Sequence, residues 1–293
     1  MSQKTAIHLA EEAASKLPPL LVEAERVAAT VAQGVHGRKK NGQGDSFWQF
    51  RPYQQGESTR RIDWRQSAKT QHHFVREYEW EIAQTIWMWR DASASMHYSA
   101  DRARETKMYR AEILTLALAA LLTRGGEQIA LLGDANPPGG GRAALHRLAS
   151  ILRNNRISNS TTSLPAHEHL PRHTELVLIG DFLSPLDDIK EALKRYSRRH
   201  VRGHLLQVLD PAEESLPFEG RVQFDGLENE GSIYFGNVAA IREEYQDRLS
   251  SRRAALSELT HALGWSFHRH STDKPAESAL LALYQSITQG RSR

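Results

Sequence analysis

Three oxygen-bearing side chains occupy alternate positions in the segment Asp91-Ala92-Ser93-Ala94-Ser95. They follow the apolar residues 86–89, a run that is typical of a buried strand. In open α/β sheets ligands bind beyond the carboxyl ends of the strands, so Asp91 is well placed for a binding site. Magnesium prefers hard oxygen ligands and keeps several waters, and one carboxylate with two hydroxyls can form part of its shell. The segment therefore predicts a site for Mg²⁺ or Mn²⁺.

A second carboxylate is expected from Asp181, which follows another apolar run at residues 176–180. A further hydroxyl is expected from Thr161 or Thr162, in the polar segment 154–163 before that run, and the sequence leaves the choice between them open. Helix capping is the alternative, because Asp and Ser are also the preferred residues at helix N-termini. For the second strand end, Asp181 or Ser184 could cap a helix that begins near Pro185.

The elements that must position these residues follow a regular order. From residue 82 on, apolar strands alternate with amphipathic helices, which indicates one doubly wound, mostly parallel sheet with helices on both faces. The strands are expected at Thr85–Trp89, Gln128–Leu132, Glu175–Ile179, Gly203–Leu209 and Trp265–His268. The helices are expected at Lys107–Leu122, Arg142–Arg153, Pro185–Arg195, Val238–Ala262 and Ala276–Ile287.

Two segments precede this α/β domain, which we place at 82–293. Residues 1–33 have helical apolar spacing broken by Pro18-Pro19, which predicts two helices. Residues 34–81 are rich in Gly, Arg and aromatic residues and are expected to be irregular or a small β structure. Within the α/β domain, residues 222–224 and 232–234 flank a Gly-containing segment and predict a hairpin attached to the sheet.

The composition excludes several classes of function. The 293 residues include no cysteine, so disulfides, thiolate metal sites and cysteine nucleophiles are ruled out, and a reducing cytoplasm is expected. The longest apolar stretch, Ile113–Leu122, falls short of the roughly 20 residues that a membrane-spanning helix needs. Acidic residues at Glu11 and Glu12 argue against a secretory signal. We therefore expect a cytoplasmic protein that does not insert into a membrane.

The metal-site pattern and the upstream segment together resemble a known family. The Asp-x-Ser-x-Ser segment, a following loop threonine and a strand ending in Asp are similar to the metal-ion-dependent adhesion site of von Willebrand factor A domains. The segment before it resembles the N-terminal signature of the DUF58 family, in which the Arg-x-Ile-Asp-Trp core is the specific part. The residues that carry this resemblance are Gly37, Arg38, Gly42, Gly44, Phe47, Arg51, Tyr53, Gly56, Glu57, Arg60, Arg61, Ile62, Asp63, Trp64, Ser67, Ala68, Lys69, Val75, Arg76 and Glu77.

The resemblance implies a bacterial, non-enzymatic adaptor. Family members are commonly encoded beside MoxR-type AAA ATPases and are thought to act in chaperone-like or complex-maturation roles with client proteins. A metal held by neutral hydroxyls keeps an open position, which a carboxylate of the partner could fill. This chain departs from the family pattern at Glu57, Lys69 and Arg90, and Arg90 could compete with a cation. We expect Asp63 and Trp64 to have structural roles, with Trp64 filling a core.

Other functions remain as alternatives. A phosphohydrolase of the haloacid dehalogenase type would use Asp91 as nucleophile, but its second Asp is replaced by Ser93. A basic group of Arg38, Arg51, Arg60 and Arg61 is a candidate partner surface, and nucleic acid is a less favoured partner for it. The histidines near residues 167–173 lack the spacing of a zinc site and are expected at the surface.

Overall fold

The computed structural model describes residues 19–35, 47–53, 58–59, 62–69, 72–78, 84–101, 104–153, 163–172, 174–227 and 231–289. These residues belong to two compact units. One unit contains helix α2 (Pro19–Val35) and the chain from Gln84 onward, and the other lies within His36–Ala83.

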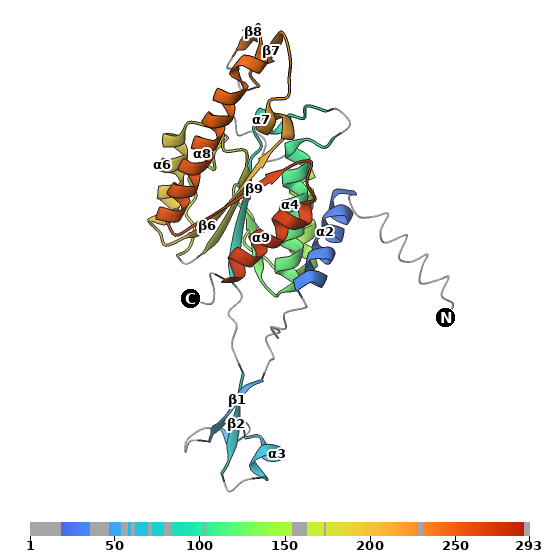
Figure 1. The fold of residues 1–293 in the computed structure, drawn as a ribbon. Coiled ribbons are helices and arrows are strands. Elements are labelled where there is room, and N and C mark those ends of the chain that lie inside the picture. The colour runs from blue at the N-terminus through green and yellow to red at the C-terminus, as the bar shows by residue number, and fades with distance from the viewer. Residues whose placement is uncertain are drawn as a thin grey trace, which may run out of the picture. The chain divides into compact units, whose positions relative to one another are not determined.

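The larger unit is built on a five-stranded parallel sheet with the order β4-β3-β5-β6-β9. This confirms the predicted α/β class, and each expected strand is present with its ends within three residues of the prediction. Figure 1 shows β6 and β9 side by side in this sheet. The strands are β3 (Thr85–Arg90), β4 (Gln128–Leu131), β5 (Glu175–Gly180), β6 (Arg202–Leu209) and β9 (Ser266–Ser271).

Helices cover both faces of the sheet, as the alternation along the strands requires. In β3, Ile86 and Met88 belong to the core beneath one layer of helices, whereas Trp87 and Trp89 belong to the core on the opposite face. The first layer contains α4 (Lys107–Arg124), α5 (Gly141–Arg153) and α9 (Ala276–Gln289), and the second contains α6 (Leu186–Ser197) and α8 (Arg242–Ala262).

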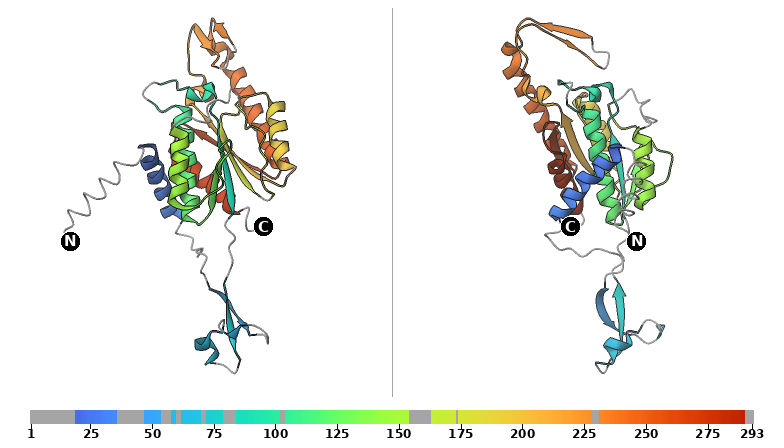
Figure 2. Two further views of the ribbon diagram at one scale, coloured as in Figure 1. Left: turned by 180° about the vertical axis from the view of Figure 1, so that it is seen from behind. Right: turned by 90° about the vertical axis from the view of Figure 1, so that its right-hand side faces the viewer.

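Helix α4 is buried on all sides because α2 covers the side that faces away from the sheet (Figure 2). The apolar stripe of α2 runs along Leu21, Ala24 and Val27, which are nearly inaccessible to solvent. A hydrogen bond of 2.7 Å from Tyr109 Oη of α4 to Glu23 Oε2 of α2 fixes the pair. A helix that is hydrophobic all round needs such double cover. The second of the two predicted N-terminal helices therefore packs on the α/β unit, and the first lies outside the described residues.

Shorter elements connect the strands. They are the 3-10 turns η2 (Ala94–His97) and η3 (Val238–Ile241), helix α7 (Pro211–Ser215), and a hairpin of β7 (Val222–Asp225) and β8 (Ser232–Phe235). The hairpin forms a two-stranded sheet of its own, so the expectation that it attaches to the main sheet is wrong. The hairpin is held together by the pairing of β7 with β8. The rings of Phe224 and Phe235 also pack edge to face across it, with their centroids 5.8 Å apart.

The smaller unit contains an antiparallel ribbon of β1 (Phe47–Pro52) and β2 (Phe74–Tyr78) and the one-turn helix α3 (Trp64–Ser67). Asp63 has the expected structural role, because its carboxylate accepts a hydrogen bond of 2.9 Å from the Gln66 amide and caps α3. Trp64 does not fill a core: its side chain is 61% exposed and lies against His73. The described part of this small unit buries Ile62 and Val75, and α3 is too short to bring its first residue into that cluster.

Candidate metal centre

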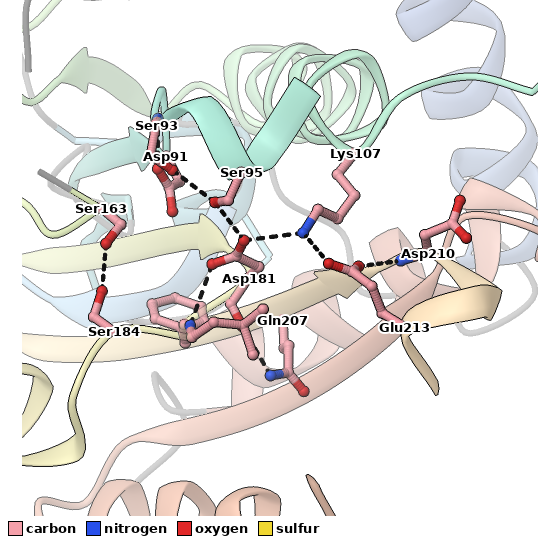
Figure 3. A network of polar contacts seen from close by, with 12 residues as sticks. Asp91, Ser93, Ser95, Lys107, Ser163, Asp181, Ser184, Gln207, Asp210 and Glu213 are labelled. Atoms are coloured by element: carbon pink, nitrogen blue, oxygen red, sulfur yellow. Dashed lines mark hydrogen bonds and ion pairs between the residues drawn. The ribbon is translucent and has the colours of Figure 1, made fainter. Parts of the chain in front are cut away.

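The predicted ligands converge where two neighbouring strands end. β3 and β5 pair in parallel, and the Asp91 amide donates to the Ile179 carbonyl at 2.8 Å, so Asp91 and Asp181 emerge at the same edge. Ser95 Oγ donates to Asp181 Oδ2 at 2.7 Å, and Ser93 Oγ lies 3.0 Å from Ser95 Oγ (Figure 3). Four of the six predicted ligands thus share one site, and the other two, Thr161 and Thr162, lie outside the described residues.

Local backbone turns aim the two carboxylates. Asp91 Oδ1 accepts a hydrogen bond from the Ser93 amide at 2.9 Å, and Asp181 Oδ1 accepts one from the Leu183 amide at 3.2 Å. Such turns are favoured by Asp, because its short side chain can bond to the backbone two residues on. Gly180 is needed beside them: a Cβ at this position would lie 2.8 Å from Asp91 Cβ.

Capping does not account for these residues. Ser93 precedes η2, but its side chain makes no capping hydrogen bond. Pro185 precedes α6 and also provides no side-chain cap, while the hydroxyl of Ser184 is bonded to that of Ser163. The alternative of simple helix capping is therefore wrong for both strand ends.

The donor set suits a hard divalent cation. Asp91, Ser93 and Asp181 are almost fully buried, and the set combines two carboxylates with two hydroxyls. Adjacent ligands of an octahedral Mg²⁺ at about 2.1 Å lie about 3 Å from each other, which matches the separation of the two serine oxygens, 3.0 Å. Among the described residues no group of three or more His, Cys, Asp or Glu side chains could hold a metal. A metal here would therefore depend on the serines and on water, as Mg²⁺ commonly does.

Lys107, the first residue of α4, is a member of the site that sequence reasoning missed. Its Nζ lies 3.0 Å from Asp181 Oδ2 and 2.6 Å from Glu213 Oε1, and its side chain is fully buried. Burial alone lowers the pKa of Lys107, but the charges of Asp181 and Glu213 outweigh it and raise the pKa above its usual value. A signal was present in the sequence, because a cation at a helix N-terminus opposes the helix dipole and needs acidic partners.

Glu213 was also missed and comes from α7, directly after β6. Asp210 and Glu213 form a reciprocal cap, in which Asp210 Oδ1 accepts from the Ala212 amide and Glu213 Oε2 accepts from the Asp210 amide. The sequence Asp-Pro-Ala-Glu is the pattern of such a cap with Pro at the first helical position, so this short helix was predictable. Burial raises the pKa of Glu213, and the neighbouring Lys107 opposes that rise.

The side chain of Arg90 pairs with residues of α4, so it does not act as the competing cation that the sequence suggested. Its Nη2 lies 3.2 Å from Glu112 Oε1 on α4, and its Nη1 lies 2.7 Å from the sulfur of Met108. Burial lowers the pKa of Arg90, while the charges of Glu112 and Asp91 raise it. The positive charge of Arg90 is therefore balanced by an acidic partner on α4.

The loop that carries Asp181 is held from behind by two further elements. Gln207 of β6 donates to the Asp181 carbonyl at 2.9 Å. Arg252 of α8 donates to the Phe182 carbonyl at 2.7 Å through Nη2 and also to the Ser184 carbonyl. Phe182 is buried with a positive φ of 52°, a conformation that costs energy for a residue with a side chain. These bonds keep the strained turn after β5 in place.

The family model of DUF58, a protein family of unknown function, matches residues 49–255 of the chain. The chain belongs to the DUF58 family. Uncharacterized proteins of Mycobacterium bovis and of two strains of Mycobacterium tuberculosis are 24% identical to this DUF58 chain over 249 residues. The similarity covers 80% of this chain and 77% of each relative.

Solved structures give more distant likenesses. The conserved hypothetical protein BatB from Bacteroides thetaiotaomicron is 15% identical with a TM-score of 0.42, and covers 72% of the DUF58 chain and 100% of its own. An aerotolerance-related membrane protein from Bacteroides fragilis is 17% identical with a TM-score of 0.41, and covers 71% and 100%. At these scores the likeness carries no argument about function.

The cytoplasmic location expected from the sequence needs correction. It is contradicted by the descriptions of the structural neighbours, which include the aerotolerance-related membrane protein and an uncharacterized membrane spanning protein from Vibrio fischeri. Within the described part of the chain, no helix is both long enough and apolar enough to cross a bilayer. The absence of cysteine and of a long apolar run could not decide this point, and we assign no location.

The basic residues of the DUF58 signature form no described cluster. Arg38, Arg60 and Arg61 lie outside the described residues. Arg51 belongs to β1, where its backbone pairs with Val75 of β2. Their proposed role as a partner surface stays a prediction. His167 and His169 are exposed, as expected, and their rings stack on each other.

Proposed function

We propose that this DUF58 protein is a metal-dependent protein-interaction module of the von Willebrand factor A type. Asp91, Ser93, Ser95 and Asp181 would hold Mg²⁺ or Mn²⁺, with Thr161 or Thr162 as a further ligand. The observation that carries the proposal is the meeting of these four described residues at the carboxyl edge of the sheet. Hydrogen bonds link the side chains of Ser93, Ser95 and Asp181, and the Ser93 amide donates to the carboxylate of Asp91.

Docking is favoured over catalysis by the chemistry of the site. The bound metal would supply a Lewis-acidic position that a partner's Asp or Glu completes, because the four described ligands leave coordination positions of Mg²⁺ open. A haloacid dehalogenase-type reaction needs an acid two residues after the nucleophile, and Ser93 cannot supply that proton. The role of Asp91 and its neighbours would therefore be to bind and orient.

The partner we propose is a MoxR-type AAA ATPase, with this protein as its adaptor toward a client protein. This step comes from the resemblance to the family and from the electrophilic character of the proposed site. It predicts that complex formation requires both the divalent metal and an intact Asp91.

Calorimetric titration of Mg²⁺ and Mn²⁺ tests the metal site. We expect saturable binding to the wild type, no binding to Asp91→Ala, and unchanged binding to Asp247→Ala, which removes an exposed carboxylate from α8. A candidate AAA ATPase should then bind the wild type in Mg²⁺ but not in EDTA. Equal metal binding by Asp91→Ala, or no binding by the wild type, would refute the site, and a complex that survives EDTA would refute metal-dependent docking.

A further inference from the structure

One carboxylate oxygen at the centre of the site has two donors from different elements. Asp181 Oδ2 accepts from Ser95 Oγ at 2.7 Å and from Lys107 Nζ at 3.0 Å. The same ammonium lies 2.6 Å from Glu213 Oε1 (Figure 3). The ammonium thus lies beside the predicted ligands and inside the protein, with side-chain exposures of 0% for Lys107, 1% for Asp181 and 17% for Glu213.

Burying the ammonium of Lys107 at this position is energetically unfavourable unless acidic groups compensate its charge. Removing an ammonium from water is strongly unfavourable, and the start of a helix adds the positive end of the helix dipole. Two carboxylates offset these costs. Asp181 is buried and Glu213 half-buried, and each lies near a further acidic group, Asp91 or Asp210. Arg252 lies close enough to feel the charge of Asp181 but donates its hydrogen bonds to backbone carbonyls. Lys107 is therefore the cation in direct contact with the carboxylate of Asp181 among the described residues.

We propose that Lys107 serves as an internal cation of the metal centre. Its ammonium is bonded to Asp181 Oδ2, a ligand oxygen of the proposed site, and its positive charge weakens the binding of the divalent ion. This inference rests on the proposed metal site and adds a determinant of its affinity. Glu213 modulates the effect, because its negative charge compensates part of the charge of Lys107.

The proposal predicts opposite effects for two neutralising substitutions. Lys107→Met removes a positive charge bonded to a ligand oxygen, so the repulsion between that charge and the metal disappears. Glu213→Gln keeps the shape but removes the compensating negative charge, so the metal meets more of the charge of Lys107. At an effective dielectric constant of about 20, a unit charge several ångströms from a divalent ion changes affinity by at least about tenfold. A role in folding alone would instead make both substitutions weaken binding.

The test is calorimetric titration of Mg²⁺ into the full-length wild type, Lys107→Met and Glu213→Gln, with Lys190→Met as the control on an exposed position of α6. We expect at least tenfold tighter binding by Lys107→Met, at least tenfold weaker binding by Glu213→Gln, and no change in the control. Thermal unfolding supplies a second measurement. Lys107→Met should have a lower Tm than the wild type in EDTA, and Mg²⁺ should raise its Tm more.

The outcomes separate this inference from the proposed function. If the wild type binds Mg²⁺ and Lys107→Met binds it no more tightly, the inference fails while the metal site stands. If the wild type does not bind the metal, the proposed site fails and the inference with it. If Lys107→Met does not fold, Glu213→Gln still decides, because tighter or unchanged binding by that variant overturns the proposal.

Discussion

A methyl group on Gly180 would strike the side chain that begins the candidate metal centre. A Cβ at this position would lie 2.8 Å from Asp91 Cβ and 3.1 Å from Asp91 Oδ2. The optimal separation of two carbon atoms is about 3.5 to 4.0 Å, so the first contact is far too close. Rotation of the Asp91 side chain cannot relieve it, because the position of Cβ is fixed by the backbone. The ends of β3 and β5 must therefore move apart in Gly180→Ala.

The expected cost follows from the packing of the sheet. Overpacking of a well-filled interior typically destabilises by about 1 to 3 kcal/mol. For a unit of this size that corresponds to a decrease in Tm of about 2 to 12 °C. Calorimetric thermal unfolding would measure the decrease, and a Mg²⁺ titration of the same variant would measure the effect on the site. We expect binding to weaken at least tenfold, because displacement of Asp91 separates it from Asp181.

Gly236→Ala is the matched control, because nothing lies within 4 Å of a Cβ at that position and its φ is not in the left-handed region. This variant should have the Tm of the wild type and its metal affinity. The reasoning would be refuted by a Gly180→Ala protein whose Tm and Mg²⁺ affinity both equal those of the wild type.

Three further predictions concern other positions in the larger unit. Burial lowers the pKa of His270 to about 4 from its ordinary 6.5. The unfolded chain therefore binds more protons than the folded protein between pH 4 and 6.5, and the free energy of unfolding should rise by about 3 kcal/mol over this range. Urea unfolding should find this rise in the wild type but not in His270→Phe, and equal pH dependence of the two proteins would contradict the prediction. Gly203→Ala would place a Cβ 1.8 Å from Cε3 of Trp265 and should destabilise by about 3 kcal/mol in thermal unfolding, with partial rescue by Trp265→Leu. Arg252→Met removes the donors to the Phe182 carbonyl and should weaken Mg²⁺ binding severalfold, while the circular dichroism spectrum stays native. Unchanged affinity would show that the turn after β5 keeps its conformation without Arg252.

The strands could be predicted because burial on both faces leaves a continuous apolar run. Segments 86–89 and 176–179 have no polar side chain, and each proved to be a central strand of the sheet. Their carboxyl ends had to share an edge once the strands were parallel neighbours, so the meeting of Asp91 and Asp181 followed from the pattern.

The polar partners of the site were harder to predict, because they depend on the reach of side chains from other elements. Lys107 was noted only as the first residue of a helix, and Glu213 lies in a five-residue helix without an apolar period. The prediction that Trp64 fills a core was wrong for another reason. Aromatic residues are usually buried, but a single helical turn in a small unit has little interior to offer.

The two halves of the oxygen cluster are far apart along the chain. Ser95 and Asp181 are separated by 86 residues, and α4, β4 and α5 lie between them. Closing so long a loop is entropically costly, and contacts of this kind form slowly. A nascent chain that has emerged only as far as α5 would have Asp91 and both serines but no partner strand for β3 on that side. At the proposed site, metal added during synthesis would stabilise only chains in which β5 has been made and paired with β3, and its uptake would report that pairing.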